Sequence, residues 1–166
     1  MFVLDTDVVS ELRRRRPNPA VVLWLQNVAE KVASTAITIM EIRFGIETAR
    51  RTNSTVAEAV ERWLAGLLEG GALEILPLDA AAAQVLGRMY ATAALRIFLA
   101  ARPGARQAKT GADLAIAAIA ISRDAAVATN NVDDFLAIQR HFALPGLFNP
   151  FTGEWHVPAA EHAARH

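Results

Sequence analysis

Four acidic residues stand at positions from which their side chains could act on one substrate. Asp5 follows the apolar run Phe2-Val3-Leu4, Glu41 lies in TAITIMEIRFG, Asp113 opens DLAIAAIA, and Asp134 lies in ATNNVDDF. Carboxylates that converge repel one another unless a hard cation or a proton compensates their charge. Oxygen ligands without His or Cys favour Mg²⁺ or Mn²⁺ over zinc. Because such ions activate water and neutralise a phosphodiester, the pattern predicts a metal-dependent nuclease.

Three of these four acids, taken alone, also have an ordinary structural explanation. Asp113 and Asp134 suit the first turn of a helix, where a carboxylate complements the helix dipole, and Glu41 suits a solvated position among isoleucines. Asp5 is the exception, because a charge beside a buried strand end is costly without a partner. The set of four, rather than any one member, indicates a functional site.

The elements that must position these acids alternate between short β-rich runs and amphipathic helices. Strands are predicted at 2–4, 32–36, 73–76, 125–128 and 147–148. Helices are predicted from Thr6 through Arg16, at 20–28, from Thr38, and at 56–68, 79–99, 112–122 and 132–141. This alternation is typical of a parallel sheet covered on both faces. Ligands bind such sheets beyond the carboxyl ends of the strands, where all four acids are expected.

Length and composition exclude several classes of protein. The chain has 166 residues, no Cys and a formal net charge of zero, so disulfides, thiol nucleophiles and binding of nucleic acid by bulk charge are excluded. Hydrophobic residues make up 53%, which excludes intrinsic disorder. We expect one domain over residues 1–150 and a tail over 151–166 whose end is partly disordered. The apolar region from Ala80 to Ala101 carries Arg88 and Arg96, so we expect no membrane span and a cytoplasmic location.

Four segments in order carry a resemblance to a known family. They are FVLDTDVVSEL from Phe2, TIMEIRFGI from Thr38, DLAIAA from Asp113 and ATNNVDDF from Ala128. Their order and spacing resemble those of PIN-domain ribonucleases, specifically the VapC toxins and their FitB-like branch. The resemblance spans nearly the whole chain up to about Pro150.

This resemblance implies a fold, an activity and a site. The fold is a PIN-like three-layer α/β/α sandwich with a central, mostly parallel sheet of four to five strands. The activity is that of an endoribonuclease toxin whose catalytic residues, Asp5, Glu41, Asp113 and Asp134, bind Mg²⁺ or Mn²⁺. The polar residues around them are Thr6, Asp7, Thr129 and Asn131. Asp7 replaces the commoner Asn, and Asp134 is favoured over Asp133 because the family places its acid immediately before Phe135.

The resemblance also implies partners. RNA is the substrate, a VapB-type antitoxin covers the acidic groove, and the chain forms a homodimer and a toxin–antitoxin hetero-oligomer. The candidate RNA contacts are Arg13, Arg14, Arg102, Arg106 and Lys109. For the run Arg13–Arg16 a solvated helix end is an equal alternative. No aromatic ladder accompanies these charges, so base stacking is not predicted.

Two other functions compete with the nuclease. Asp5-Thr6-Asp7-Val8-Val9 also resembles the nucleophile motif of haloacid-dehalogenase-like phosphatases, with Asp5 as nucleophile and Lys109 as the phosphate-binding lysine. That reading leaves Glu41 and Asp113 without a role. A non-catalytic PIN-like binding module is the second alternative, and it would be favoured if any of the four acids pointed away from the others.

Overall fold

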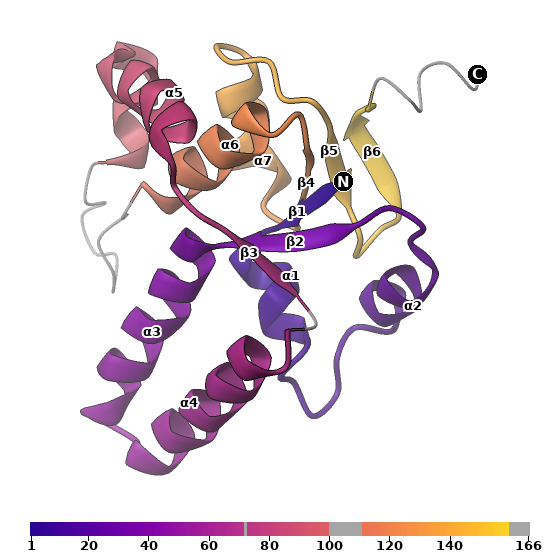
Figure 1. Ribbon diagram of the computed structural model, residues 1–166, viewed down its shortest axis with the longest axis vertical. Helices are drawn as coiled ribbons and strands as arrows, with labels where there is room; N and C mark the ends of the chain where they lie inside the picture. The colour runs from indigo at the N-terminus through magenta and orange to yellow at the C-terminus, as the bar shows by residue number, and fades with distance from the viewer. Residues whose placement is uncertain (72, 100–110, 160–166) are drawn as a thin grey trace.

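The centre of the molecule is a six-stranded sheet (Figure 1). The computed structural model describes residues 1–71, 73–99 and 111–159. The strands are β1 (Phe2–Leu4), β2 (Val32–Thr35), β3 (Glu74–Leu76), β4 (Ala126–Ala128), β5 (Leu147–Asn149) and β6 (Glu154–Val157). Their order is β3-β2-β1-β4-β5-β6, and only the β5–β6 pair is antiparallel. The predicted mostly parallel sheet is confirmed, with β6 as an additional strand.

Helices connect the parallel strands. They are α1 (Thr6–Glu11), α2 (Pro19–Asn27), α3 (Ala36–Arg50), α4 (Ser54–Glu69), α5 (Ala80–Ala91), the 3₁₀ helix η1 (Ala93–Phe98), α6 (Ala112–Ser122) and α7 (Val132–Gln139). Buried residues line α6 on nearly every side, as its almost uninterrupted apolar sequence predicts. None of the helices in the described residues is long and apolar enough to cross a membrane.

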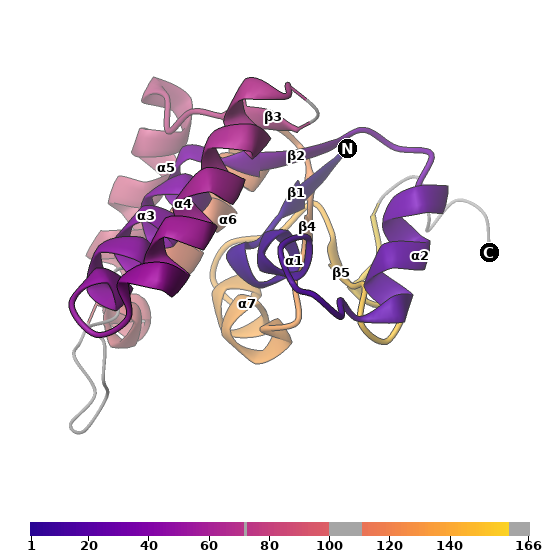
Figure 2. The same cartoon turned by 90° about the horizontal axis from the view of Figure 1, so that it is seen from below.

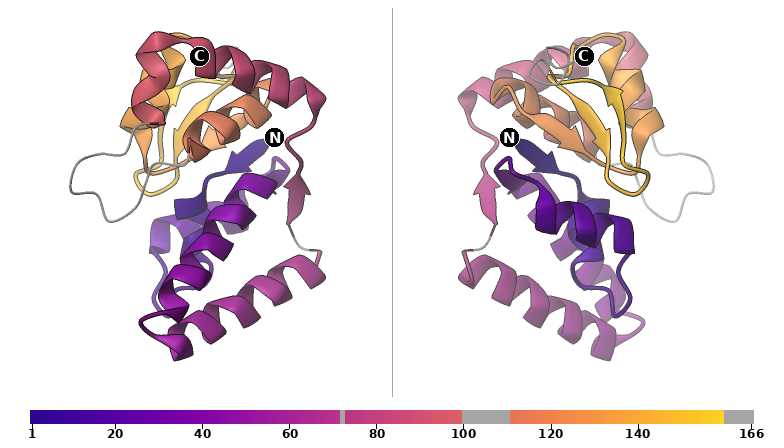
Figure 3. Two further views of the ribbon diagram at one scale, coloured as in Figure 1. Left: turned by 90° about the vertical axis from the view of Figure 1, so that its left-hand side faces the viewer. Right: turned by 90° about the vertical axis from the view of Figure 1, so that its right-hand side faces the viewer.

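The helices form one layer on each face of the sheet. Successive strand residues point to opposite faces, so Val3 of β1 packs with the residues of α5, α6 and α7, whereas Phe2 and Leu4 pack with those of α1, α2, α3 and α4. On the second face, α1 lies between α2 and the neighbouring pair α3 and α4 (Figures 2 and 3). The predicted three-layer α/β/α sandwich is therefore confirmed.

The first helix ends earlier than its sequence predicts. A helix was expected from Thr6 through Arg16, but α1 ends at Glu11. The Glu11 side chain is buried; its carboxylate accepts a hydrogen bond from the Asn18 backbone N–H at 2.8 Å and pairs with Arg14 at 2.6 Å. Because Asn18 then caps α2, this one carboxylate fixes both ends of the loop that carries Arg13–Arg16.

Two further segments differ from the expected boundaries. The predicted helix over 79–99 is divided at Thr92, whose backbone is extended and whose hydroxyl donates to the Arg88 carbonyl. The expected tail beyond residue 150 contributes β6, which pairs with β5 from Asn149 to Leu147. The proposed domain boundary at residue 150 thus falls in the turn between two paired strands, and residues 160–166 lie outside the described part of the chain.

Candidate active site

Asp5 occupies the carboxyl end of the central strand β1. Its side chain is 5% exposed and caps α1 by accepting the Thr6 backbone N–H at 2.7 Å. Its second oxygen accepts the buried Thr129 hydroxyl at 2.7 Å, from the end of the neighbouring strand β4. Burial raises the pKa of Asp5 well above its usual range, and the charges of Asp7 and Asp113 raise it further against these two hydrogen bonds.

Asp7 lies in the first turn of α1, and its carboxylate contacts the segment that follows β4. It accepts the Asn130 backbone N–H at 2.8 Å, and the Val8 backbone N–H at 2.6 Å. Burial raises its pKa, while these hydrogen bonds lower it. The charge of Asp7 in turn raises the pKa of both Asp5 and Glu41, so this one carboxylate acts on both.

Glu41 reaches the same region from the second turn of α3, which follows directly after β2. Its carboxylate accepts the Thr6 hydroxyl at 2.5 Å, so Thr6 joins the two elements. Burial raises the pKa of Glu41, the Thr6 hydrogen bond lowers it, and the charge of Asp7 raises it. Glu41 is therefore half-buried and engaged with the site, not a solvated residue of the helix surface.

Asp113 stands in the first turn of α6. Gly111 precedes it with φ 70°, and a Cβ at Gly111 would lie 2.8 Å from Leu99 Cδ2, so a glycine is required where the chain enters this helix. The half-buried Asp113 lies close enough to Asp5 for its charge to raise the pKa of that carboxyl. The sheet and α6 thus bring these two acids together, as their positions predict.

Asp134 is connected to Asp5 indirectly, through Asn131 and Thr129. Its carboxylate accepts a hydrogen bond from the Asn131 side chain at 3.1 Å, and the Asn131 backbone N–H donates to the Thr129 hydroxyl at 2.8 Å. Since that hydroxyl also donates to Asp5, a chain of polar contacts connects Asp134 with the end of β1. The neighbouring Asp133 is exposed, whereas Asp134 is partly buried, which favours Asp134 of this pair.

The donor set fits a hard divalent cation. All the candidate ligands are carboxylates. Burial raises the pKa of Asp5, Asp7 and Glu41, and the charge of a neighbouring carboxylate raises those of Asp5 and Glu41 further, so a positive charge among them would be stabilising. Within the described residues, however, no three His, Cys, Asp or Glu side chains are grouped closely enough to hold a metal ion. The carboxylates share one edge of the sheet, and binding would have to draw them closer.

The basic candidates divide into three groups. Arg13 lines a cavity of about 220 Å³ between α1, α3 and α4, together with Thr6, Ser10 and Glu41 at its polar end. Arg14 instead pairs with buried Glu11. Arg102, Arg106 and Lys109 lie outside the described residues.

The sequence-based prediction missed two asparagines near these acids. The Asn130 backbone N–H binds Asp7, and the Asn130 side chain accepts the Asn149 amide at 3.4 Å. Asn130 directly follows Thr129 at the end of β4, and Asn149 ends β5. The rule that parallel strands place their carboxyl ends at one edge would have identified both residues.

Comparison with known proteins identifies the family of this chain. The PIN domain family matches residues 2–140. Toxin FitB of Neisseria gonorrhoeae is 32% identical over 159 residues, covering 94% of this chain and 99% of FitB. VapC ribonuclease Y4jK of Sinorhizobium fredii is 31% identical over 146 residues, covering 82% of this chain and 91% of Y4jK.

A solved structure is similar over almost its full length. The crystal structure of FitAcB from Neisseria gonorrhoeae has a chain 32% identical to this one, with a TM-score of 0.63, covering 91% of this chain and 99% of that one. The predicted resemblance is thus confirmed, and the phosphatase alternative, which needs a different fold family, is wrong. This chain belongs to the PIN-domain family, among the relatives of the FitB and VapC toxins.

Proposed function

We propose that this protein is a Mg²⁺- or Mn²⁺-dependent endoribonuclease and the toxin of a toxin–antitoxin pair. The observation that carries the proposal is the group of carboxyls at the ends of β1 and β2, where burial raises the pKa of Asp5, Asp7 and Glu41. Such a group is costly to ionise in isolation, and it suits a site completed by a cation and a phosphate. The ribonuclease name of the relative Y4jK supports RNA as the substrate.

The residues that would hold the cation are Asp5, Glu41, Asp113 and Asp134. When bound, the cation would promote ionisation of a water and neutralise charge on the scissile phosphate. The Thr129 hydroxyl orients Asp5 and the Thr6 hydroxyl orients Glu41, because each donates to one carboxylate oxygen. The Asn131 amide does the same for Asp134.

Proton transfer from the attacking water falls to a carboxylate of this group. Glu41 suits this role through an oxygen that does not bind the cation, because its side chain is partly exposed beside the cavity that Arg13 lines. Arg13 would bind a phosphate of the RNA next to the reacting one. Arg14 would act indirectly, because its pairing with Glu11 holds the loop in place.

The partner of the proposed toxin is a VapB- or FitA-type antitoxin that covers the acidic groove. The solved neighbours include FitAB bound to a DNA fragment. A homodimer through α3 is part of the proposal, because Met40 is 46% and Phe44 49% exposed on that helix. Ile46 of the same helix is buried in the core and is not available to such an interface. We place the complex in the cytoplasm, where its RNA substrate is.

Cleavage of a mixed RNA pool tests the proposal directly. The purified full chain is incubated with Mg²⁺, with Mn²⁺ or with EDTA, beside the variants Asp5→Asn and Asp113→Asn and a phosphomonoester substrate. We expect metal-dependent cleavage of RNA that both variants lose, without hydrolysis of the phosphomonoester. Cleavage that persists in EDTA or in both variants would contradict the proposal. RNA that survives intact with antitoxin-free protein would favour the binding-module alternative.

A further inference from the structure

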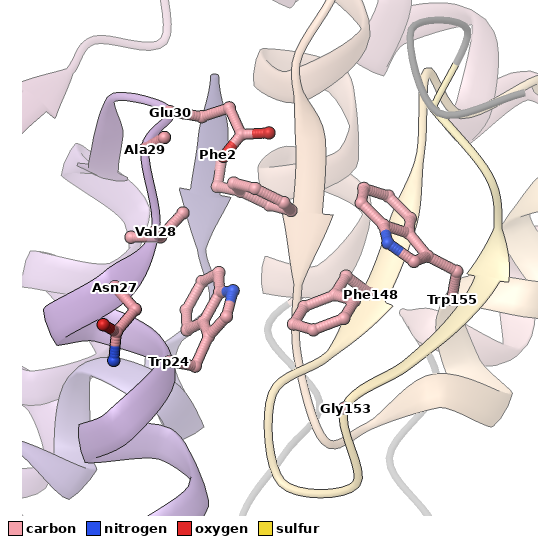
Figure 4. Close-up of a pocket in the computed structure, with 9 residues that line it drawn as sticks. All are labelled: Phe2, Trp24, Asn27, Val28, Ala29, Glu30, Phe148, Gly153 and Trp155. Carbon is pink, nitrogen blue, oxygen red and sulfur yellow. The ribbon is translucent and has the colours of Figure 1, made fainter. Parts of the chain in front are cut away.

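Four aromatic rings from distant parts of the chain surround an open cavity between α2 and the β5–β6 hairpin (Figure 4). We call this surface, formed by Phe2, Trp24, Phe148 and Trp155, the aromatic groove. Its volume is about 460 Å³. Phe2 and Phe148 are 4% and 7% exposed and form the floor, whereas Trp24 and Trp155 are partly exposed and stand on opposite sides.

The rings form one continuous apolar surface. The Phe2 centroid lies 5.2 Å from that of Trp24 and 5.5 Å from that of Trp155, and the Phe148 centroid lies 5.3 and 5.1 Å from the same two. Beyond Trp24 a second cavity of about 410 Å³ continues along α2 to Ala20, near the start of the helix. Two partly exposed indole rings that stand over buried phenyl rings beside an open channel offer faces on which unpaired bases can stack.

Two connections link the aromatic groove to the candidate active site. Asn149 directly follows Phe148 in β5, and its amide donates to Asn130 at 3.4 Å; the Asn130 backbone N–H in turn binds Asp7. The second connection is the loop between α1 and α2. It begins after α1, the helix that Asp5 caps, and ends at Asn18, two residues before Ala20 of the second cavity.

Charges of opposite sign lie toward the two ends of the aromatic groove. The run Arg13–Arg16 lies in the loop between the site and the groove, and all four side chains are exposed. Glu30 lines the opposite end of the groove, where it would repel a phosphate. A polyanionic strand is therefore favoured on the side that leads to the carboxylates and disfavoured beyond Glu30.

We propose that the aromatic groove stacks bases of a single-stranded RNA whose backbone crosses the Arg13–Arg16 loop on its way to the carboxylate site. This inference rests on the proposed nuclease function and adds to it a base-binding subsite that lies away from the cleavage point. Stacking accepts any base, so the groove selects unpaired over duplex RNA and contributes affinity more than sequence preference. The positive charge of the loop that leads into α2 favours this ligand over an apolar protein segment.

The test measures binding of a 12-nucleotide single-stranded RNA to the full chain in EDTA, by tryptophan fluorescence and by anisotropy of a labelled strand. We expect quenching of tryptophan emission, and a weaker Kd by roughly 5- to 150-fold in Trp24→Ala and in Trp155→Ala. Trp63→Phe is the matched control, because Trp63 lies on α4 outside the groove and should leave the Kd unchanged. A duplex RNA of the same sequence cannot stack its bases in the aromatic groove, so its Kd should be the same for the parent chain and for the two Trp variants.

A charge variant keeps the test valid if a Trp→Ala protein unfolds. Thr152 is exposed and lines the second cavity, so Thr152→Glu removes no buried contact and should weaken RNA binding by repulsion. Gln84→Glu adds the same charge at an exposed position of α5, on the other layer, and should not.

Unchanged RNA affinity in Trp24→Ala, Trp155→Ala and Thr152→Glu would overturn the inference, as would the absence of any RNA binding. So would variants that lose a bound protein partner while they bind RNA as the parent chain does. Cleavage of RNA by the parent protein with Mn²⁺ is measured separately. If the groove variants weaken RNA binding but the parent protein cleaves no RNA, the nuclease proposal fails and the base-binding role of the aromatic groove is retained. If the parent protein cleaves RNA but the groove variants bind RNA with unchanged affinity, the nuclease proposal is retained and the base-binding role fails.

Discussion

Two regions of this molecule hold carboxylates in opposite electrostatic surroundings. Between α3 and α4, Arg43 and Arg50 both pair with Glu61, at 2.5 and 2.8 Å, on the surface. These arginines lower the pKa of Glu61, and Glu61 raises theirs. At the ends of β1 and β2, burial raises the pKa of Asp5, Asp7 and Glu41, and hydrogen bonds from hydroxyl and backbone N–H groups of the described residues lower it.

The difference separates charges that serve the fold from charges that serve a ligand. The surface network is satisfied within the chain and screened by water, so it contributes little to stability. The carboxylate site is buried, and its ionisation opposes folding until a ligand of opposite charge binds. Variants of the two regions should therefore respond differently to metal, pH and substitution.

The largest effect is expected for Asp5→Asn. Activity should fall by at least about 100-fold, because a ligand that neutralises charge in the transition state contributes several kcal/mol. The metal-free protein should at the same time become more stable at pH 7, because Asn keeps an acceptor for Thr6 and carries no buried charge. RNA cleavage rates and thermal unfolding in EDTA measure both. A variant that loses activity and stability together would show that Asp5 serves the fold instead.

A smaller loss of activity is expected for Thr129→Val. The buried Thr129 hydroxyl donates to Asp5 and accepts from Asn131, so its removal frees the Asp5 carboxylate and leaves a backbone N–H without this acceptor. Removing such a supporting hydrogen bond typically costs about 10- to 100-fold in activity or metal affinity. Thr48→Val, at an exposed hydroxyl on α3, is the control. Equal activity of both variants would exclude an orienting role for Thr129.

The pH dependence of stability should distinguish the two regions as well. Because the folded-state pKa of Asp5 is raised above 3.8, the folded protein binds more protons than the unfolded chain just above that pH, so stability is lost as pH rises through the raised value. Asp7 and Glu41 act in the same direction. In EDTA, the urea midpoint should decrease with rising pH more steeply for the parent chain than for Asp5→Asn. Parallel curves for the two proteins would contradict this.

The smallest effect is expected for Glu61→Gln in the surface network. The substitution breaks both arginine pairs, yet all three side chains remain in water. We expect RNA cleavage unchanged and a thermal midpoint that differs from the parent's only at low ionic strength, where screening is weak. A large loss of stability at 0.15 M salt would mean that the network contributes to the fold after all.

The sequence was sufficient for the five parallel strands and for the strand ends that Asp5 and Glu41 follow. The apolar segment 112–122 could only be buried, and α6 has these bounds. The rule for parallel strands placed Asp5 and Glu41 at one edge, since each follows a strand. The family motif then separated Asp134 from Asp133, in line with the exposure of Asp133.

Contacts between distant segments account for what the sequence did not predict. The loop after α1 depends on a carboxylate of Glu11 that binds seven residues ahead, and no local pattern encodes that. The strand β6 has only Trp155 and Val157 as apolar residues, so its pairing with β5 decides its structure. The aromatic groove joins residues from positions 2, 24, 148 and 155, which become neighbours only through the fold.

Direct binding of Mn²⁺ tests the central claim that the carboxylates at the strand ends form a cation site. The measurement is isothermal titration of Mn²⁺ into the antitoxin-free full chain at pH 7, beside Asp5→Asn, Asp113→Asn and the surface control Glu61→Gln. We predict saturable binding to the parent chain and to Glu61→Gln, with release of protons, and none to the two site variants. Equal binding to all four proteins, or to none of them, would contradict it.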